Sequence, residues 1–402
     1  MKKYLSYEEI NNNPEITRDE AMEALSRCID VTENGLSRYK GEFPSANSES
    51  GFYIPGPNVG WTTGFWTGEV WLSWLNTKDP EKKKYFRNEG EKQVDSFLER
   101  IKNKIDVDYH DMGFLYMPSC AAAWKLTKNE KGREAALLAA DQLMTRYRPI
   151  GEYIQAWGSM DDPNNHRLII DCLLNVPLLY FASDETGDEK YRDAANKHIQ
   201  TTLRHIIRED GSTWHTLFFD PDDGHFLRGA TSQGYCDTST WARGQSWGIY
   251  GTALSYARTK EEEYVEDFRK TAGYFLSHLP DDLCPYWDLS FGNGDEAKEP
   301  RDSSAASIAC CGFLVMSRLL KSKEAEEYRK IAGRILYSLI KNYQVRNSSV
   351  SDGQLLHGTY AKSTPYNDCK NGGVDECVIW GDYYFMEALY RYLYPETESF
   401  WE

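Results

Sequence analysis

The sequence predicts an all-α protein folded as an (α/α)6 barrel, a closed double ring of six helical hairpins. Two observations lead to this prediction. Segments that are apolar on nearly all sides alternate along the whole chain with amphipathic segments that bury one stripe and keep the opposite face in water. Long, uneven links separate several of the resulting helix pairs. An inner ring of buried helices inside an outer ring of half-buried helices satisfies both observations.

The amphipathic segments are expected to form the outer ring. Most of them begin near an aromatic residue or an arginine and then carry apolar residues at helical spacing among charged ones. Six such segments occur, at residues 17 to about 38, 85–101, 133–147, 191–207, 268–279 and 328–340.

The apolar segments are expected to form the inner ring, because a helix that is apolar all round is a buried helix. They are rich in Ala, Gly, Ser and Cys, and such small residues allow helices to approach one another closely. Six segments of this kind occur, at residues 67–75, 114–126, 168–182, 241–257, 303–320 and 378–393.

The links favour a closed barrel over an open α-solenoid, which the alternation alone also permits. Those at residues 55–66, 211–240, 280–302 and 345–376 are longer than the turns of a solenoid. Long loops at one face of a barrel commonly carry a functional site. Because a single hairpin cannot bury its own apolar face, we expect the ring to close as one domain over residues 1–402.

Composition narrows the class of protein further. The formal charge of −16 disfavours a nucleic-acid partner, and the 14% of aromatic residues excludes a disordered acidic chain. No apolar run reaches the roughly 18 residues of a membrane-spanning helix, and the first residues lack the apolar stretch of a signal peptide. The nine cysteines include no Cys-x-x-Cys pair, which favours reduced thiols in a cytoplasmic protein.

Two acidic residues are candidates for catalysis. Asp171 lies in the apolar run Leu-Ile-Ile-Asp-Cys-Leu-Leu, where an ionised and unpaired carboxylate is costly. Such a group is either satisfied structurally or held with a raised pKa for proton transfer. Asp111 precedes another buried helix, where it would also suit a helix N-cap. If the two acids meet at the mouth of the barrel, their proximity favours one neutral acid beside one ionised base.

Aromatic residues near the expected helix starts are candidates for sugar binding. Arginine, glutamine and histidine residues, among them Arg243, occur in the motifs that contain or neighbour Trp66, Trp241 and Trp247. Large aromatics are usually core residues, but their faces beside such polar groups also suit a sugar ring. We expect the sugar platform for these three, and Trp157 is compatible with either role.

Metal and cofactor sites are not expected. The eight histidines are scattered without the His-x-x-x-His spacing of a helical metal site. His215 by itself is more typical of a hydrogen-bonded loop histidine than of a catalyst. The sequence also contains no phosphate loop, dinucleotide fingerprint or Gly-x-Ser-x-Gly elbow.

Several short motifs are more informative together than any one of them alone. They are Gly64-Phe65-Trp66-Thr67-Gly68, His110-Asp111-Met112-Gly113-Phe114, Ile170-Asp171-Cys172-Leu173-Leu174-Asn175, Trp214-His215, Gln233-Gly234 and Trp241-Ala242-Arg243-Gly244-Gln245-Ser246-Trp247. In this order, from Trp66 to about Tyr360, the chain resembles the unsaturated glucuronyl hydrolases of glycoside hydrolase family 88. The resemblance implies an (α/α)6 barrel, in agreement with the helix pattern.

The resemblance also implies a reaction. Polysaccharide lyases leave a 4,5-unsaturated uronic acid at the non-reducing end of their products, and enzymes of this family remove it. An acid protonates C4 of the enol ether, positive charge develops at C5 and the ring oxygen, and water is added at C5. The resulting hemiketal opens and releases the rest of the sugar. Asp171 matches the general acid/base, and Asp111 matches the partner acid that binds sugar hydroxyls and orients Asp171.

Other positions match substrate contacts of the family. They are Trp66, His110, Trp157, His215, Gln233, Trp241, Arg243, Trp247 and Tyr360. Arg243 or a loop donor is expected to hold the uronate carboxylate. Some bacterial members recognise sulfate with a late loop that carries Ser-x-x-Ser-x-Lys, a spacing that residues 362–370 lack. Lys370 is a candidate anion contact, although a solvated loop lysine is the favoured interpretation, so sulfate preference stays open.

The expected function is removal of the unsaturated uronic acid from lyase-generated di- or oligosaccharides of hyaluronan, chondroitin or heparin. The related unsaturated rhamnogalacturonyl hydrolases, which act on pectin fragments, are the alternative. An inverting glycosidase that acts on intact polysaccharide and a non-enzymatic sugar-binding or interaction protein are more remote possibilities. The sequence leaves open the oligomeric state and whether the oxygen that attacks first belongs to water or to a neighbouring sugar hydroxyl.

Overall fold

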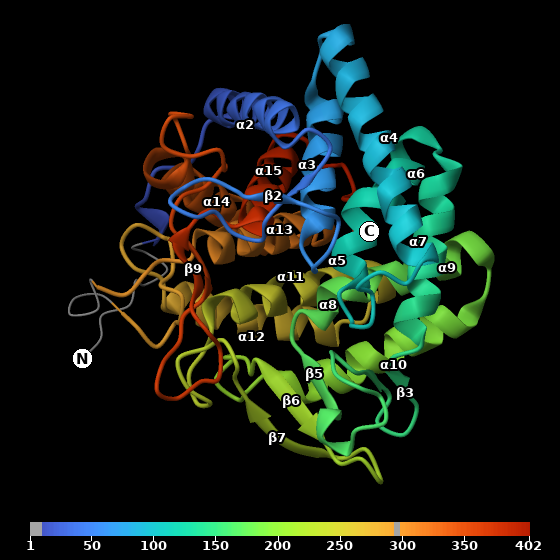
Figure 1. Ribbon diagram of the computed structural model, residues 1–402. Helices are drawn as coiled ribbons and strands as arrows, with labels where there is room; N and C mark the ends of the chain where they lie inside the picture. Colours follow the sequence, from blue (N-terminus) through green and yellow to red (C-terminus); the bar gives the residue numbers. More distant parts are fainter. Residues whose placement is uncertain (1–9, 293–297) are drawn as a thin grey trace.

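The computed structural model describes residues 10–292 and 298–402. Over these residues the predicted alternation of buried and amphipathic helices is confirmed, and the fold is the predicted double ring (Figure 1). The expected lack of a signal peptide concerns the start of the chain, of which residues 1–9 lie outside the described part. Among the described residues, no helix is long and apolar enough to cross a membrane.

The inner ring consists of the apolar segments. Its helices are α3 (Thr63–Asn76), α5 (Met112–Tyr116) with the π-helical turn η1 (Met117–Ala121) and α6 (Ala122–Thr127), α8 (Cys172–Asn175) with α9 (Pro177–Thr186), α11 (Ala242–Thr259), α13 (Ser303–Leu319) and α15 (Ile379–Leu393). Neighbouring segments pack against each other in this order, and α15 packs against α3. This last contact closes the ring.

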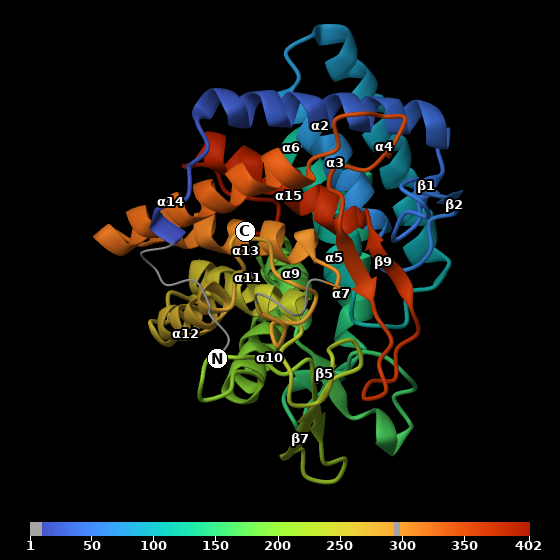
Figure 2. The same ribbon diagram turned by 90° about the vertical axis from the view of Figure 1, so that its left-hand side faces the viewer.

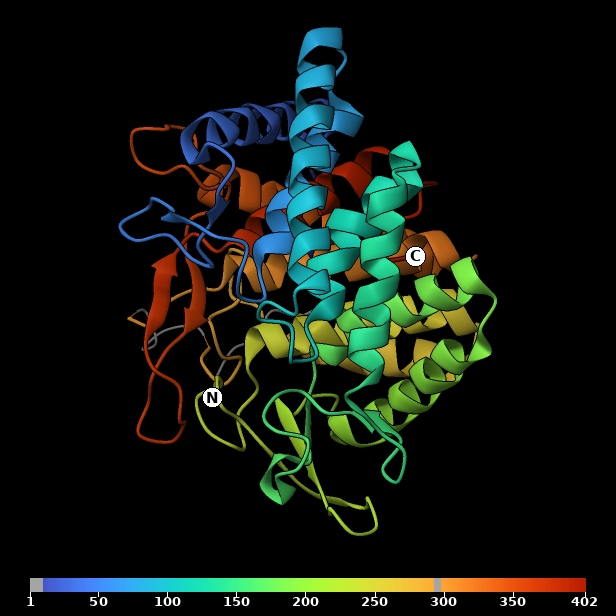
Figure 3. The ribbon, with the colours of Figure 1, turned by 45° about the vertical axis from the view of Figure 1, so that its right-hand side comes forward.

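The outer ring consists of the amphipathic segments. Its helices are α2 (Arg18–Tyr39), α4 (Pro80–Lys102), α7 (Glu130–Met144), α10 (Glu189–Ile206), α12 (Glu263–Ser277) and α14 (Lys323–Ser338), which is followed by the π-helical turn η3 (Leu339–Tyr343). α2 packs on α15 and α3, and α4 packs on α3 and α7. Figure 3 shows α4 and α7 side by side in front of the inner helices.

Local sequence explains the two kinds of helix. Thr17 and Glu20 form a reciprocal capping box that satisfies the first amides of α2. α11 buries every residue from Ala242 to Ser255, whereas α10 buries one stripe and exposes the other faces. Small residues allow the inner helices to touch, since a Cβ on Gly312 of α13 would lie 3.0 Å from Cα of Tyr250 on α11.

Short antiparallel strands lie in the links at one end of the barrel, and the helix pattern did not reveal them. They are β1 (Phe43–Pro44) with β2 (Pro55–Gly56), β3 (Tyr147–Arg148) with β4 (Tyr153–Ile154), β5 (Arg167–Ile169) with β6 (Thr216–Phe219) and β7 (Phe226–Ala230), and β8 (Gly358–Ala361) with β9 (Gly372–Glu376). The 3-10 turn η2 (Pro163–Asn165) precedes β5. In Figure 2, β1, β2 and β9 lie along one side of the molecule, with β5 and β7 below them.

One expected inner helix begins later than predicted. The helix expected over residues 168–182 starts at Cys172, because Leu168 and Ile169 belong to β5 and pair with Leu217 and Thr216 of β6. A short apolar run has no periodicity that separates a buried strand from a buried helix. The strand ends just before Asp171 and places it in the turn that leads into the helix.

The segment after α15 turns back into the ring. Trp401 is buried, and its ring stacks on Tyr384 at a centroid distance of 6.0 Å. Its Nε1 donates to Oε2 of Glu387 at 3.0 Å, and its ring also meets Phe114 of α5 edge-on. Trp401 therefore fills the interior behind the helix starts that carry the acids.

Candidate active site

A pocket of about 310 Å³ opens where α5, α8 and α11 begin. Sites for small molecules commonly measure about 300–1,000 Å³. Its walls comprise Trp61, His110, Asp111, Trp157, Ile169, Asp171, His215, Ser232, Gln233, Trp241, Arg243, Trp247 and Tyr360. The structure thus gathers the residues predicted from sequence, with the exception of Trp66 and Lys370.

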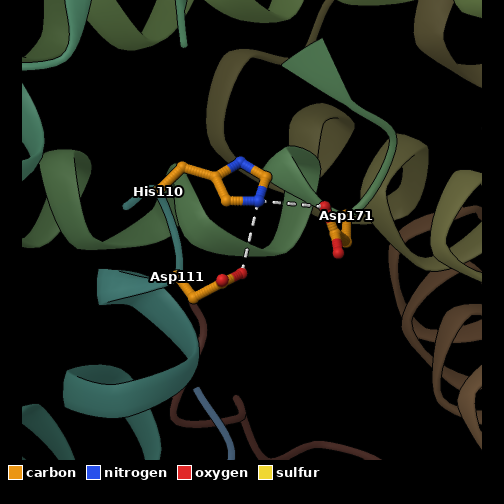
Figure 4. Close-up of side chains that lie close together, drawn as sticks. All are labelled: His110, Asp111 and Asp171. Carbon is orange, nitrogen blue, oxygen red and sulfur yellow. Dashed lines mark ion pairs between the residues drawn. The ribbon is translucent and has the colours of Figure 1, made fainter. Parts of the chain in front are cut away.

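His110 bridges the two acids of the pocket. Its Nε2 lies 3.3 Å from Oδ1 of Asp111 and 3.4 Å from Oδ1 of Asp171 (Figure 4). Asp111 immediately precedes α5 and Asp171 immediately precedes α8, yet neither carboxylate caps its helix. Asp111 thus occupies the N-cap position that the sequence suggested but does not cap through its side chain, and both carboxylates are available to the pocket.

Burial sets the protonation of this cluster. It raises the pKa of Asp171 to about 7, against a smaller opposing effect of the Arg243 charge. Burial also raises the pKa of Asp111 well above its usual value, and the charge of Asp171 raises it further. Burial lowers the pKa of His110 to about 3. Near neutral pH the histidine is therefore uncharged, and the acid pair retains at least one proton.

Asn175 connects the two acids, a role that the sequence did not predict. Its Nδ2 donates to Oδ1 of Asp111 at 3.4 Å and to the carbonyl of Asp171 at 3.2 Å, while its Oδ1 accepts from the amide of Phe114 at 2.8 Å. Gly113 permits this contact, because a Cβ there would lie 2.2 Å from Cα of Asn175. The sequence feature that could have indicated this role is that Asn175 is a polar residue in an apolar run, one helical turn after Asp171.

His215 is held in one tautomer. Its Nδ1 accepts hydrogen bonds from the amide of Ser232 at 3.2 Å and from Oγ1 of Thr216 at 2.7 Å. The proton is therefore on Nε2, which donates to Oε1 of Gln233 at 3.3 Å. Burial lowers the pKa of His215 to about 4, so the ring is neutral. His215 and Gln233 therefore present hydrogen-bonding groups to the pocket in a fixed orientation.

Arg243 is largely committed to the protein. Nη1 donates to the carbonyl of Thr359 at 2.6 Å and to Oδ2 of Asp302 at 3.1 Å, and Nη2 donates to the carbonyl of Tyr360 at 2.7 Å. The guanidinium also lies over the ring of Trp241 at 4.3 Å. Arg243 thus fixes β8 at the mouth, and only part of its donor set is left for a uronate carboxylate.

Aromatic faces form much of the remaining wall. Trp241 meets His215 edge-on at 4.8 Å, and Trp247 is almost fully buried. Trp157 is 41% exposed and stands at the rim. Trp61 donates from Nε1 to the hydroxyl of Tyr360 at 3.0 Å. Predicted and unpredicted aromatics therefore share the wall.

Two predicted contacts lie elsewhere. Trp66 is 3% exposed and packs edge-on against Tyr39 of α2, so it faces the outer ring, and its assignment to the mouth is wrong. Trp61, which precedes α3, lines the pocket in its place. Lys370 is exposed in the β8–β9 hairpin loop and does not line the pocket, in agreement with the interpretation as a solvated loop lysine.

The site also offers ligand atoms suited to a cation. His110, Asp111 and Asp171 place one ligand atom each within 4.8 Å of one another. Asp220, Asp223 and His225 do so on a more exposed turn. Carboxylates and a neutral imidazole bind several divalent metals. The expectation that the enzyme uses no metal stays a prediction.

The double ring and the acid pair at its mouth define a glycoside hydrolase. The family model described as Glycosyl Hydrolase Family 88 matches residues 37–392, and the chain belongs to this family. The predicted family and enzyme class are therefore confirmed.

Relatives are similar over nearly their full length. The chain is 41% identical to the unsaturated chondroitin disaccharide hydrolase of Streptococcus pneumoniae, over 100% of this chain and 98% of the relative. It is 39% identical to the unsaturated glucuronyl hydrolase of a Bacillus species, over 92% and 96%. The crystal structure of the Streptococcus agalactiae unsaturated glucuronyl hydrolase has a TM-score of 0.90 and 41% identity, covering 96% of this chain and 95% of that one.

Proposed function

We propose that the protein removes the 4,5-unsaturated uronic acid from the non-reducing end of lyase-generated glycosaminoglycan oligosaccharides by hydrating the C4=C5 enol ether. The observation that carries the proposal is Asp171, a buried acid with a pKa of about 7 that faces a pocket of suitable size. The similarity to unsaturated chondroitin disaccharide hydrolases supports this substrate class. A variant of the Streptococcus agalactiae enzyme in complex with dGlcA-GalNAc6S, at 38% identity, supports it as well.

Asp171 is the proton donor in this proposal. At neutral pH its carboxyl is protonated in a large fraction of molecules, which suits transfer of a proton to C4. The carboxylate that remains then faces the positive charge at C5 and the ring oxygen. Water adds to C5 and returns its proton to Asp171, so the enzyme ends each cycle as it began. The hemiketal then opens and releases the second sugar.

The neighbours of Asp171 hold it and the substrate in place. Neutral His110 contacts both carboxyl groups, and Asn175 anchors Asp111 beside them. Asp111 accepts hydrogen bonds from sugar hydroxyls in this proposal. The fixed edge of His215 and Gln233 and the aromatic wall orient the uronate ring.

Loss of the near-ultraviolet absorbance of the unsaturated sugar measures the reaction directly. We expect this loss with a chondroitin-lyase disaccharide and expect Asp171→Asn to reduce kcat by about 10²–10⁴-fold, the usual contribution of a general acid. Asp95→Asn, an exposed change on α4, is the matched control. Unchanged circular dichroism would show that the variants fold.

Two outcomes would contradict the proposal. Wild-type protein that leaves every glycosaminoglycan disaccharide unchanged but consumes an unsaturated pectin fragment would assign it to the rhamnogalacturonyl class. Full turnover by Asp171→Asn would show that Asp171 is not the proton donor.

A further inference from the structure

A second pocket adjoins the first. It measures about 320 Å³ and lies between the β5–β6–β7 sheet and the loop at residues 365–368. Trp157 and Ser232 line both pockets, so the two are continuous at the rim. A disaccharide whose first ring lies against the acids extends its second ring toward this space.

Two arginines stand in a row across the sheet of the second pocket. In the antiparallel register, Arg167 of β5 is opposite Phe218 of β6, and Phe218 is opposite Arg228 of β7. Directly paired residues project from the same face of a sheet. The guanidinium of Arg228 lies over the ring of Phe218 at 4.1 Å, and that of Arg167 lies over the ring of Trp157 at 3.6 Å. Stacking fixes both planar groups and leaves the edge of Arg228 free to donate.

These arginines are weakly neutralised. Neither forms an ion pair with another described residue within 4 Å, although the acids Asp162 and Asp368 act on Arg167 from farther away. Arg167 donates from Nη2 to Oδ1 of Asn165, while its Nε is buried and has no partner in the described part of the chain. Exposed Arg228 has no hydrogen-bond partner among the described residues.

The carboxylates of the second pocket do not neutralise the positive charge of Arg167 and Arg228. Asp237 accepts the amide of Thr231 at 2.9 Å, which occupies one of its oxygens. Asp368 stands on the opposite loop, where its charge acts on Arg167. Arg228 therefore remains an open cation in a chain whose net charge is −16.

We propose that Arg228, with Arg167 beside it, binds a sulfate ester on the second sugar of the substrate and so determines specificity. The proposal rests on the function proposed above. A planar guanidinium donates two parallel hydrogen bonds to tetrahedral oxyanions such as sulfate. The second sugar of a glycosaminoglycan disaccharide is a neutral hexosamine unless it carries sulfate. Lys370, which the sequence suggested for this role, lines neither pocket.

The test compares kcat/KM for two unsaturated chondroitin disaccharides, one sulfated on the hexosamine and one not. We expect wild-type protein to favour the sulfated one and Arg228→Gln to reduce that preference about tenfold, the effect of losing a charge-assisted hydrogen bond. Arg167→Gln should reduce it in the same direction, and Arg228→Lys should restore part of it. Arg87→Gln, a half-exposed arginine of α4, controls for a general loss of positive charge.

The inference and the proposed function fail in different ways. If the wild type consumes neither of these disaccharides nor any other unsaturated glycosaminoglycan disaccharide, the proposed function is wrong. If it consumes both without favouring the sulfated one, or if Arg228→Gln and Arg167→Gln keep the preference, the inference is overturned while the function stands. Loss of the preference in Lys370→Gln and not in Arg228→Gln would also overturn it.

Discussion

Apolar surroundings raise the pKa of two aspartates of this protein to about 7, but only one of them can meet a substrate. Asp382 of α15 is 1% exposed and accepts the amide of Leu355 and the hydroxyl of Tyr53. Asp171 keeps 17% of its side chain exposed and lines the pocket. A raised pKa therefore marks a catalytic acid only where the carboxyl also faces open space.

The pH dependence of turnover should reflect Asp171. Its pKa is raised, so the protonated donor is abundant below about 7 and is lost as the pH rises above that value. We expect kcat/KM to fall about tenfold for each pH unit well above 7. Initial rates across a buffer series would measure this. A flat profile up to pH 9 would mean that another group supplies the proton.

At the scale of elements, the contact between the starts of α5 and α8 sets the distance between the two acids. Gly113 lies directly against the backbone of Asn175, and the side chain of Asn175 holds Asp111 and Phe114 in turn. The site thus depends on how closely two helices approach and not only on which residues they carry.

Gly113→Ala should therefore impair catalysis. The added methyl would meet Cα of Asn175 at 2.2 Å and push α5 away from α8, at a cost of about 1–3 kcal/mol in stability. We expect a larger proportional loss of kcat than of thermal stability. Gly273→Ala on α12 is the control, because its Cβ meets nothing within 4 Å and helix propensity alone should stabilise it slightly. Normal kcat in Gly113→Ala would show that the acids tolerate a shift.

A second contact between elements joins α3 and α15 through a buried acid pair. Burial and the charge of Asp382 raise the pKa of Glu69 well above its usual value. The folded state therefore binds protons more tightly than the unfolded state, and stability falls as the pH rises from about 4 to about 7. Gln354 donates from Nε2 to Oε2 of Glu69 at 3.2 Å, a bond that glutamine at position 69 can also accept.

Glu69→Gln should relieve this penalty. We expect its Tm to exceed that of the wild type by about 1–3 °C near pH 8, with the gain disappearing near pH 4, where both acids are protonated. Calorimetry at both pH values would measure the difference. Glu134→Gln, an exposed change on α7, should show no such pH dependence. An equal gain at both pH values would point to packing instead of charge.

The helices were predictable because burial of one face spaces their apolar residues at regular intervals. The errors lie in segments where that spacing does not distinguish one structure from another. The run Leu168-Ile169-Ile170 is short and apolar, so its sequence predicts a helix, although β6 pairs with this segment. Trp66 shares a motif with the mouth residues, but the helix turns its ring toward α2. Arg167 and Arg228 meet only through the pairing of three strands, which no local pattern indicates.

At the scale of the whole molecule, one buried side chain links the last residues to the site. Trp401 touches α15 through Tyr384 and α5 through Phe114, and Phe114 in turn packs against Trp247 of the pocket wall. Aromatic side chains from distant parts of the chain thus form a connected cluster in the interior of the ring.

Trp401→Ala should weaken both stability and catalysis. Removing a buried tryptophan costs about 3–5 kcal/mol, because the interior cannot collapse to fill the space. We expect a lower Tm together with a reduced kcat, since Phe114 follows the helix start that carries Asp111. Trp74→Ala, on the partly exposed side of α3, is the matched control. An unchanged Tm in Trp401→Ala would show that the ring holds without this residue.

The contact between α3 and α15 also has a consequence for synthesis. α3 leaves the ribosome early, and the helix that covers its open side is made only when the chain reaches residues 379–393. Until then the nascent chain presents the apolar flank of an incomplete ring to its surroundings. Slower translation prolongs that exposure, so the yield of folded protein should depend on chaperones that shield such surfaces during elongation.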